Sequence, residues 1–167
     1  MVLNAEIAEL RQMRGGQSNP TFLVVTDRDE YVLRKQPPGD LLPSAHAVDR
    51  EFRVIEALAG TDVPVPRAVL FCPDREVIGT PFYVMHRLAG PIPRKELPAG
   101  VQLDRDQVAA LCRNVLDLLA GLHSVDVAGS GLADLGKGPG YVRRQVEGWS
   151  QRFRRARTWN VGTFGSV

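Results

Sequence analysis

The residues best suited to chemistry in this chain are a glycine-rich turn and a cation at the end of a nearby strand. The turn is Gly15-Gly16-Gln17-Ser18-Asn19, and the cation is Arg34. Glycine lets the backbone approach a ligand, so the amides of Gln17, Ser18 and Asn19 could point at phosphate oxygens. The pattern indicates a polyphosphate site, with an ordinary tight turn as the alternative. No Gly-Lys-Ser/Thr sequence follows, so this is not a Walker A loop.

Arg34 ends the apolar run Tyr31-Val32-Leu33, which places its charge at the rim of an apolar region. A buried cation needs a partner, and Glu51 is the best placed acid because it adjoins the apolar position Phe52 of the next helix. We therefore expect an Arg34–Glu51 pair, with an exposed strand-end cation as the alternative. Lys35 faces the other side of the strand and is the fallback for the phosphate contact.

The elements that position these residues follow from the apolar pattern. Helical spacing of apolar residues predicts a helix over 3–13, a second helix over 44–59 with Ser44 as N-cap, and a long helix over 104–123 with Asp104 as N-cap. A last amphipathic helix begins near Val142. Apolar and β-branched runs predict strands over 21–25, 31–34, 68–72 and 81–85. Strands and helices are segregated along the chain, which is typical of the α+β class.

Composition narrows the possible partners. The 167 residues are 44% hydrophobic and 24% charged, with a net charge of +2, so nothing favours nucleic acid or a polybasic membrane anchor. The arginines near the C-terminus fit a solvated helix face better than a patch for phosphate or an acidic partner. No apolar run is long enough to cross a membrane, and no signal peptide is expected.

Residues that usually carry catalysis or bind metal are not arranged for either task. No histidine is followed two residues later by Asp, and His46, His86 and His123 are given no catalytic role. Asp-x-Asp strings occur only in a predicted turn and a helix cap. The two cysteines, Cys72 and Cys112, match no metal spacing. Cys112 lies on an apolar helix face, where a buried free thiol is expected, which fits a reducing, cytoplasmic setting.

Several segments together resemble the aminoglycoside-phosphotransferase-like kinases, and most of all the subgroup found alone in actinobacteria or fused to acyl-CoA dehydrogenases in animals. The resemblance runs from Gly15 to Phe153. Its motifs, in order, are GGQSNPT (15–21), YVLRK (31–35), DREFRV (49–54), GTPFYVM (79–85) and LLAGLHSVD (118–126). Each motif alone is weak, and their order carries the specificity.

The resemblance implies a protein-kinase-like fold with an N-lobe over residues 1–86, a hinge and linker over 87–103, and a partial helical lobe over 104–167. The glycine hairpin would cover the phosphates of ATP or GTP. Arg34 would take the place of the lysine of the third kinase strand, and Glu51 that of its helix partner. The hinge would run from Met85 to Leu88, with backbone contacts to the base at His86 and Leu88.

Two departures from the family pattern limit the activity expected. Arginine stands where the family has lysine; it keeps the charge but is bulkier. The catalytic loop and the aspartate that binds Mg²⁺ in the family lie C-terminal to these motifs, and this chain has neither. We expect the N-terminal part of an ATP-dependent small-molecule phosphotransferase whose acceptor is a hydroxyl group, for example on a hydroxyacyl thioester. Alone, this chain should bind nucleotide at most.

Two other hypotheses stay open. The chain could be a non-catalytic, pseudokinase-like module that binds nucleotide or docks a partner. It could also self-associate through the apolar stripe at residues 108–122 of the helix over 104–123, because that stripe is wide enough to require a covering surface. The sequence does not decide between these hypotheses, and it does not name the acceptor.

Overall fold

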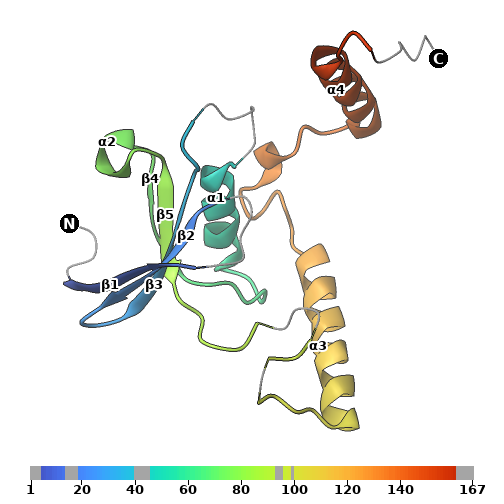
Figure 1. The fold of residues 1–167 in the computed structure, drawn as a ribbon. Helices are drawn as coiled ribbons and strands as arrows, with labels where there is room; N and C mark the ends of the chain where they lie inside the picture. Colours follow the sequence, from blue (N-terminus) through green and yellow to red (C-terminus); the bar gives the residue numbers. More distant parts are fainter. Residues whose placement is uncertain (1–4, 14–18, 40–45, 93–95, 99, 161–167) are drawn as a thin grey trace. The chain divides into compact units, whose positions relative to one another are not determined.

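The structure is a computed structural model, and it describes residues 5–13, 19–39, 46–92, 96–98 and 100–160. Two compact units are present, Met1–Ala133 and Asp134–Val167. The first contains a five-stranded sheet made of β1 (Ile7–Gln12), β2 (Thr21–Thr26), β3 (Glu30–Lys35), β4 (Ala68–Cys72) and β5 (Phe82–His86). The strand order is β1-β2-β3-β5-β4, and every neighbouring pair is antiparallel (Figure 1).

Among the described helices, α1 (Val48–Leu58) packs against this sheet. It lies against β4 and β5 and buries Val48 and Leu58. The core of the sheet comes from adjacent residues of its middle strands, such as Leu23 and Val24 of β2 and Tyr83 and Val84 of β5. Successive strand residues point to opposite faces, so burial of both members of each pair shows that the centre of the sheet is covered on both faces.

The predicted helix over residues 3–13 is wrong, because Ile7–Gln12 forms the edge strand β1. Its backbone pairs with β2, and the amide of Met13 extends the ladder by donating to the carbonyl of Thr21 at 2.8 Å. Ile7 and Leu10 are 58% and 61% exposed. The helical spacing of these apolar residues therefore did not indicate a buried face. Residues 7–12 are extended because their backbone groups pair with those of β2.

The other predicted elements are present with small shifts. Strand 68–72 has the expected bounds, and α1 is shorter than expected because it begins at Val48. The predicted cap Ser44 lies outside the described residues. A short helix α2 (Arg75–Ile78) follows the predicted turn, capped by Asp74, whose Oδ1 accepts from the amide of Glu76 at 2.9 Å.

Helix α3 (Arg105–His123) begins as predicted at Asp104. Asp104 and Gln107 form a reciprocal capping box, with bonds of 2.8 and 3.0 Å. The apolar residues of this helix are largely exposed; Leu116, for example, is 64% exposed. Cys112 is exposed too, so the expectation that it is buried is wrong for the described structure. The reason is that α1, not α3, is the described helix that packs on the sheet.

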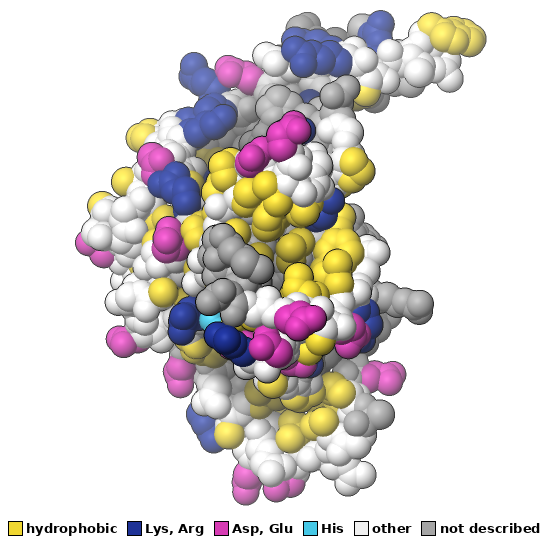
Figure 2. All heavy atoms as spheres, turned by 90° about the vertical axis from the view of Figure 1, so that its left-hand side faces the viewer, with side chains coloured by type: hydrophobic (Ala, Val, Ile, Leu, Met, Phe, Trp, Pro, Cys, Tyr) yellow, Lys and Arg dark blue, Asp and Glu magenta, His cyan; other side chains and the backbone are white. Residues whose placement is uncertain are grey.

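The second unit contains helix α4 (Tyr141–Ala156), and a short 3₁₀ helix η1 (Ala133–Leu135) lies where the two units join along the chain. The guanidinium of Arg152 lies 4.9 Å from the ring centre of Trp149, an exposed cation–π contact. No helix of the described residues is long and apolar enough to cross a membrane. On the face shown in Figure 2, charged side chains of both signs are mixed, and hydrophobic side chains reach the surface in several places.

Candidate functional site

Arg34 of β3 and Glu51 of α1, the pair expected from the sequence, lie in contact. Arg34 Nε is 3.0 Å from Glu51 Oε2, and Arg34 Nη2 donates to Oε1 at 3.3 Å. About a third of each side chain is exposed, so the pair sits at the boundary between core and solvent. Glu51 is in the first turn of α1, where the helix dipole favours a carboxylate. Arg34 therefore presents a fixed, partly exposed positive charge.

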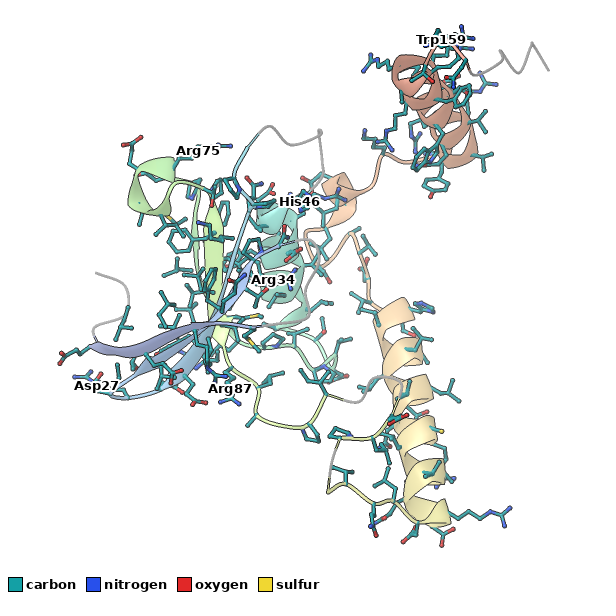
Figure 3. All side chains as sticks on the ribbon, in the orientation of Figure 1. Asp27, Arg34, His46, Arg75, Arg87 and Trp159 are labelled. Carbon is teal, nitrogen blue, oxygen red and sulfur yellow. The ribbon has the colours of Figure 1, made fainter. Side chains whose placement is uncertain are left out.

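Two further side chains hold the same carboxylate. Tyr83 of β5 donates its hydroxyl to Glu51 Oε2 at 3.0 Å, and Asn19 donates its side-chain amide to Oε1 at 2.9 Å. Strand pairing brings these groups together, because Arg34 lies opposite Thr21 of β2 on one side and Tyr83 on the other. Glu51 Oε1 thus accepts from Asn19 and Arg34, and Oε2 accepts from Tyr83 and lies near Arg34 Nε. The cluster is built from β3, β5, α1 and the segment that leads into β2. Figure 3 labels Arg34 within this region.

The position of Tyr83 is fixed by apolar packing. Its ring lies 6.1 Å from that of Phe52, the neighbour of Glu51, and Phe52 also lies 5.9 Å from Phe71 of β4. Tyr83 is 2% exposed. This burial, and next the charge of Glu51, raise the pKa of Tyr83 well above its ordinary value. The phenol therefore stays protonated and acts as a donor to Glu51.

A cavity of about 560 Å³ lies beside the sheet. Its lining residues come from the end of β1, from β2 and from the residue after β5, namely Arg11, Gln12, Met13, Leu23 and Arg87. Its size is in the range of small-molecule sites. Arg87 lies between the two predicted base contacts, His86 and Leu88, so the cavity adjoins the segment expected to act as the hinge.

Side-chain contacts fix the start of that hinge. The ring of His86 lies 4.9 Å from the Tyr31 ring, and its Nδ1 is 3.0 Å from Asp29 Oδ2. Its backbone amide donates to the carbonyl of Arg67 at 2.9 Å, so this amide is already engaged within the protein. Arg87 pairs with Glu30 of β3. Leu88, the next residue, is 68% exposed.

The remaining predicted site residues fall into three groups. Gly15, Gly16, Gln17 and Ser18 lie outside the described residues. Met85 is in β5 opposite Val32. Lys35, the alternative phosphate contact, donates its ammonium group to the carbonyl of Ile78 at 3.2 Å, so it is engaged away from Glu51.

Sequence reasoning missed two members of the cluster around Glu51. Tyr83 could have been found only from the β3–β5 register, since nothing in its own motif points to Arg34. His46 also went unassigned, although its Nδ1 lies 2.9 Å from Asn19 Oδ1. The cavity residues of β1 were missed because that segment was expected to be helical.

A Mg²⁺ site is not evident in the described part of the chain, where no three His, Cys, Asp or Glu side chains are grouped to hold a metal ion. The carboxylate of Glu51 already contacts Arg34, Asn19 and Tyr83. The donor set present is cationic and amide-rich, which suits an anion and not a cation. The arrangement can hold phosphate oxygens, and nothing in it activates an acceptor.

Known proteins are similar to this chain over most of its length. A sequence profile described as "Phosphotransferase enzyme family" matches residues 9–161. Acyl-CoA dehydrogenase family member 11 of Rattus norvegicus is 43% identical over 149 residues, which is 89% of this chain and 19% of that protein. Probable acyl-CoA dehydrogenase IBR3 of Arabidopsis thaliana is 43% identical over 150 residues, covering 87% and 18% respectively. The chain thus spans less than a fifth of these relatives.

A solved structure is similar as well. The crystal structure of a "putative aminoglycoside phosphotransferase" from Ralstonia eutropha matches with a TM-score of 0.71 at 35% identity, over 96% of this chain and 46% of that one. Its likeness confirms the predicted α+β, protein-kinase-like fold. Together with the profile match, it shows that the chain belongs to the phosphotransferase enzyme family.

Proposed function

We propose that this chain is the nucleotide-binding part of a phosphotransferase that moves the γ-phosphoryl group of ATP, or GTP, to a hydroxyl group of a small molecule. The observation that carries the proposal is the Arg34–Glu51 pair, held from both sides by Asn19 and Tyr83. A guanidinium has five N–H donors, and its contacts to Glu51 involve only Nε and Nη2. Donors therefore remain that can bind a phosphate oxygen.

In this proposal the adenine or guanine base of the nucleotide lies in the cavity lined by Arg87. The carbonyl of His86 accepts from the exocyclic amine of adenine, and the amide of Leu88 donates to the ring nitrogen beside it. Met85 precedes them as the last strand residue before the hinge. The glycine hairpin, including Gly15–Asn19, covers the phosphates. Residues 1–86, 87–103 and 104–167 then act as N-lobe, hinge and the first part of the helical lobe.

The acceptor is the least constrained part of the proposal. Several relatives carry acyl-CoA dehydrogenase in their names. These names favour a hydroxyacyl thioester over an antibiotic as the alcohol. We also propose a cytoplasmic location, which the free thiols of Cys72 and Cys112 support. The family match supports phosphoryl transfer in general, and the hydroxyl acceptor is our extension of it.

Catalysis needs groups that the described residues do not supply. Phosphoryl transfer requires a residue that orients the hydroxyl and a metal that neutralises the phosphates. The described part of the chain offers no metal site, so we assign no step to Mg²⁺. We therefore propose that this chain alone binds nucleotide without turnover. The alternative is a pseudokinase-like module. If that module binds nucleotide, it makes the same prediction for this chain; if it only docks a partner, it predicts no ATP binding.

Calorimetric titration with ATP and with adenosine tests the base site. Met13 is 38% exposed and lines the cavity, so Met13→Trp should fill it and weaken both ligands by about tenfold, or about 1.4 kcal/mol. Leu116→Trp on α3 adds the same bulk away from the cavity and should change neither affinity. Absence of ATP binding to the wild-type chain would overturn the proposal. Phosphoryl transfer by this chain alone would overturn only its predicted inactivity.

A further inference from the structure

Asn19 has a role in this structure that its place in the glycine-rich motif does not reveal. The motif suggests that the backbone amide of Asn19 faces phosphate. Asn19 is, however, only 4% exposed, and its side chain points inward to Glu51. The side-chain amide donates to Glu51 Oε1 at 2.9 Å, and its oxygen lies 2.9 Å from His46 Nδ1. One small side chain therefore bridges two residues near the start of α1.

The chemistry of the partners fixes the orientation of this bridge. A carboxylate accepts hydrogen bonds and cannot donate them, so the NH₂ end of Asn19 must face Glu51 and its carbonyl end must face His46. His46 Nδ1 must then carry the hydrogen. The neutral ring is thereby held as the Nδ1–H tautomer, which is a specific and observable state.

Both ends of the bridge are anchored. On the strand side, the carbonyl of Asn19 accepts from the hydroxyl of Thr21 at 3.0 Å, and the carbonyl of Pro20 accepts from the amide of Lys35 at 3.0 Å. On the helix side, the carbonyl of His46 accepts from the amide of Val48 at 2.9 Å, and His46 has φ 58°, a left-handed conformation that is costly for a residue with a side chain. Among the described contacts, the one between His46 Nδ1 and Asn19 Oδ1 holds the His46 ring in place.

We propose that Asn19 is a positioning residue that ties the segment leading into β2 to the first turn of α1, and so sets Glu51 and Arg34 for a nucleotide phosphate. The coupling between β2 and α1 stands on the contacts above. The phosphate part rests on the proposed nucleotide binding. Asn19 acts through Glu51, because the carboxylate that orients Arg34 takes one of its hydrogen bonds from Asn19.

One substitution and a matched control test this role. Asn19→Ala removes both bonds. Asn114→Ala removes the same amide from the exposed helix α3 and serves as the matched control. Thermal unfolding of each variant verifies that the chain still folds before binding is compared.

The first readout is the ¹⁵N spectrum of the imidazole rings, which needs no nucleotide. We expect His46 in the wild-type chain and in Asn114→Ala to show the Nδ1–H tautomer, and Asn19→Ala to lose this preference. An unchanged His46 tautomer in Asn19→Ala would overturn the coupling. If Asn19→Ala does not fold, the wild-type spectrum decides, because an Nε2–H tautomer there excludes the bridge as described.

The second readout separates positioning from general stability. Asn19→Ala should weaken ATP by about tenfold and adenosine by less than about twofold, because only ATP reaches Arg34. Equal weakening of both ligands, or none, would overturn the phosphate part. If the wild-type chain binds no ATP, the proposed function and this phosphate role both fail, and the tautomer alone reports whether Asn19 ties β2 to α1.

Discussion

Apolar residues are buried in one region of the molecule and exposed in another. The first region is the sheet together with α1, and the second is the long helix α3. In the first region Val48 is completely buried and Tyr83 is 2% exposed, and the Tyr83 hydroxyl donates to Glu51 of α1. In α3 the corresponding apolar side chains, such as Val115 and Leu116, are more than half exposed. The first region therefore completes its own core within the described residues, whereas α3 presents an apolar face that the described residues of its own unit leave exposed.

This difference bears on function. Asn19, Arg34 and Glu51, proposed to act on the phosphate side, come from the region with the buried core, so their geometry depends on contacts within that region. The chain covers 46% of the solved structure that it resembles. We propose that the sheet with α1 holds the nucleotide in a preformed site and that the helical part contributes to the acceptor side.

Matched truncations of leucine should give the largest contrast between the two regions. Leu58 of α1 is 5% exposed, so Leu58→Ala should lower the free energy of unfolding by about 2–5 kcal/mol. Leu118 of α3 is 48% exposed, and Leu118→Ala should change it by less than about 1 kcal/mol. Urea unfolding measures both. A large loss for Leu118→Ala would mean that α3 is covered in solution, and light scattering would then show whether a second copy covers it.

Removal of the Glu51 carboxylate should cause the next largest loss in the free energy of unfolding. Glu51→Ala leaves Arg34, Tyr83 and Asn19 without their shared acceptor, and should cost about 1–3 kcal/mol, limited by the partial exposure of the pair. Glu56→Ala removes an exposed carboxylate from the same helix and should stay within about 0.5 kcal/mol. Chemical denaturation distinguishes them. Equal losses would show that the cluster adds nothing beyond the helix propensity of alanine.

The buried phenol should make stability fall at high pH. Because the pKa of Tyr83 is raised, the native chain keeps this proton where the unfolded chain loses it. The contribution is intact below about pH 10 and declines above it by at most about 1.4 kcal/mol per pH unit. Unfolding between pH 8 and 11 should therefore show a weaker high-pH decline in Tyr83→Phe than in the wild type. Tyr141→Phe, exposed on α4, should keep the wild-type slope; identical slopes in all three would contradict the burial of the phenol.

The sequence predicted the fold well where the period of the apolar residues matched the element. Strands β2 to β5 and helices α1, α3 and α4 follow from such runs, although the apolar residues of α3 and α4 are exposed, and the Asp104 cap follows from its side chain. β1 was missed because Ile7 and Leu10 have helical spacing in a segment that forms a strand. Its conformation depends on pairing with β2, a contact between segments that local patterns do not contain.

The site was predictable only in part, for a similar reason. The Arg34–Glu51 pair could be expected because Glu51 adjoins Phe52 on the face of α1 that meets the sheet. The contribution of Tyr83 depends on the β3–β5 register, and the inward turn of Asn19 depends on where α1 starts. Neither register nor helix placement can be derived from residue types alone.

The most direct test of the account compares two adjacent cations of β3 in their effect on ATP affinity. Arg34 lies beside Glu51, whereas Lys35 contacts the carbonyl of Ile78. We predict that Arg34→Ala weakens ATP by about 10–100-fold, as expected for loss of charge-assisted bonds, and leaves adenosine nearly unchanged. Lys35→Ala should alter neither. Weakened ATP binding in Lys35→Ala together with wild-type affinity in Arg34→Ala would contradict the proposal that the Arg34–Glu51 pair is the phosphate site.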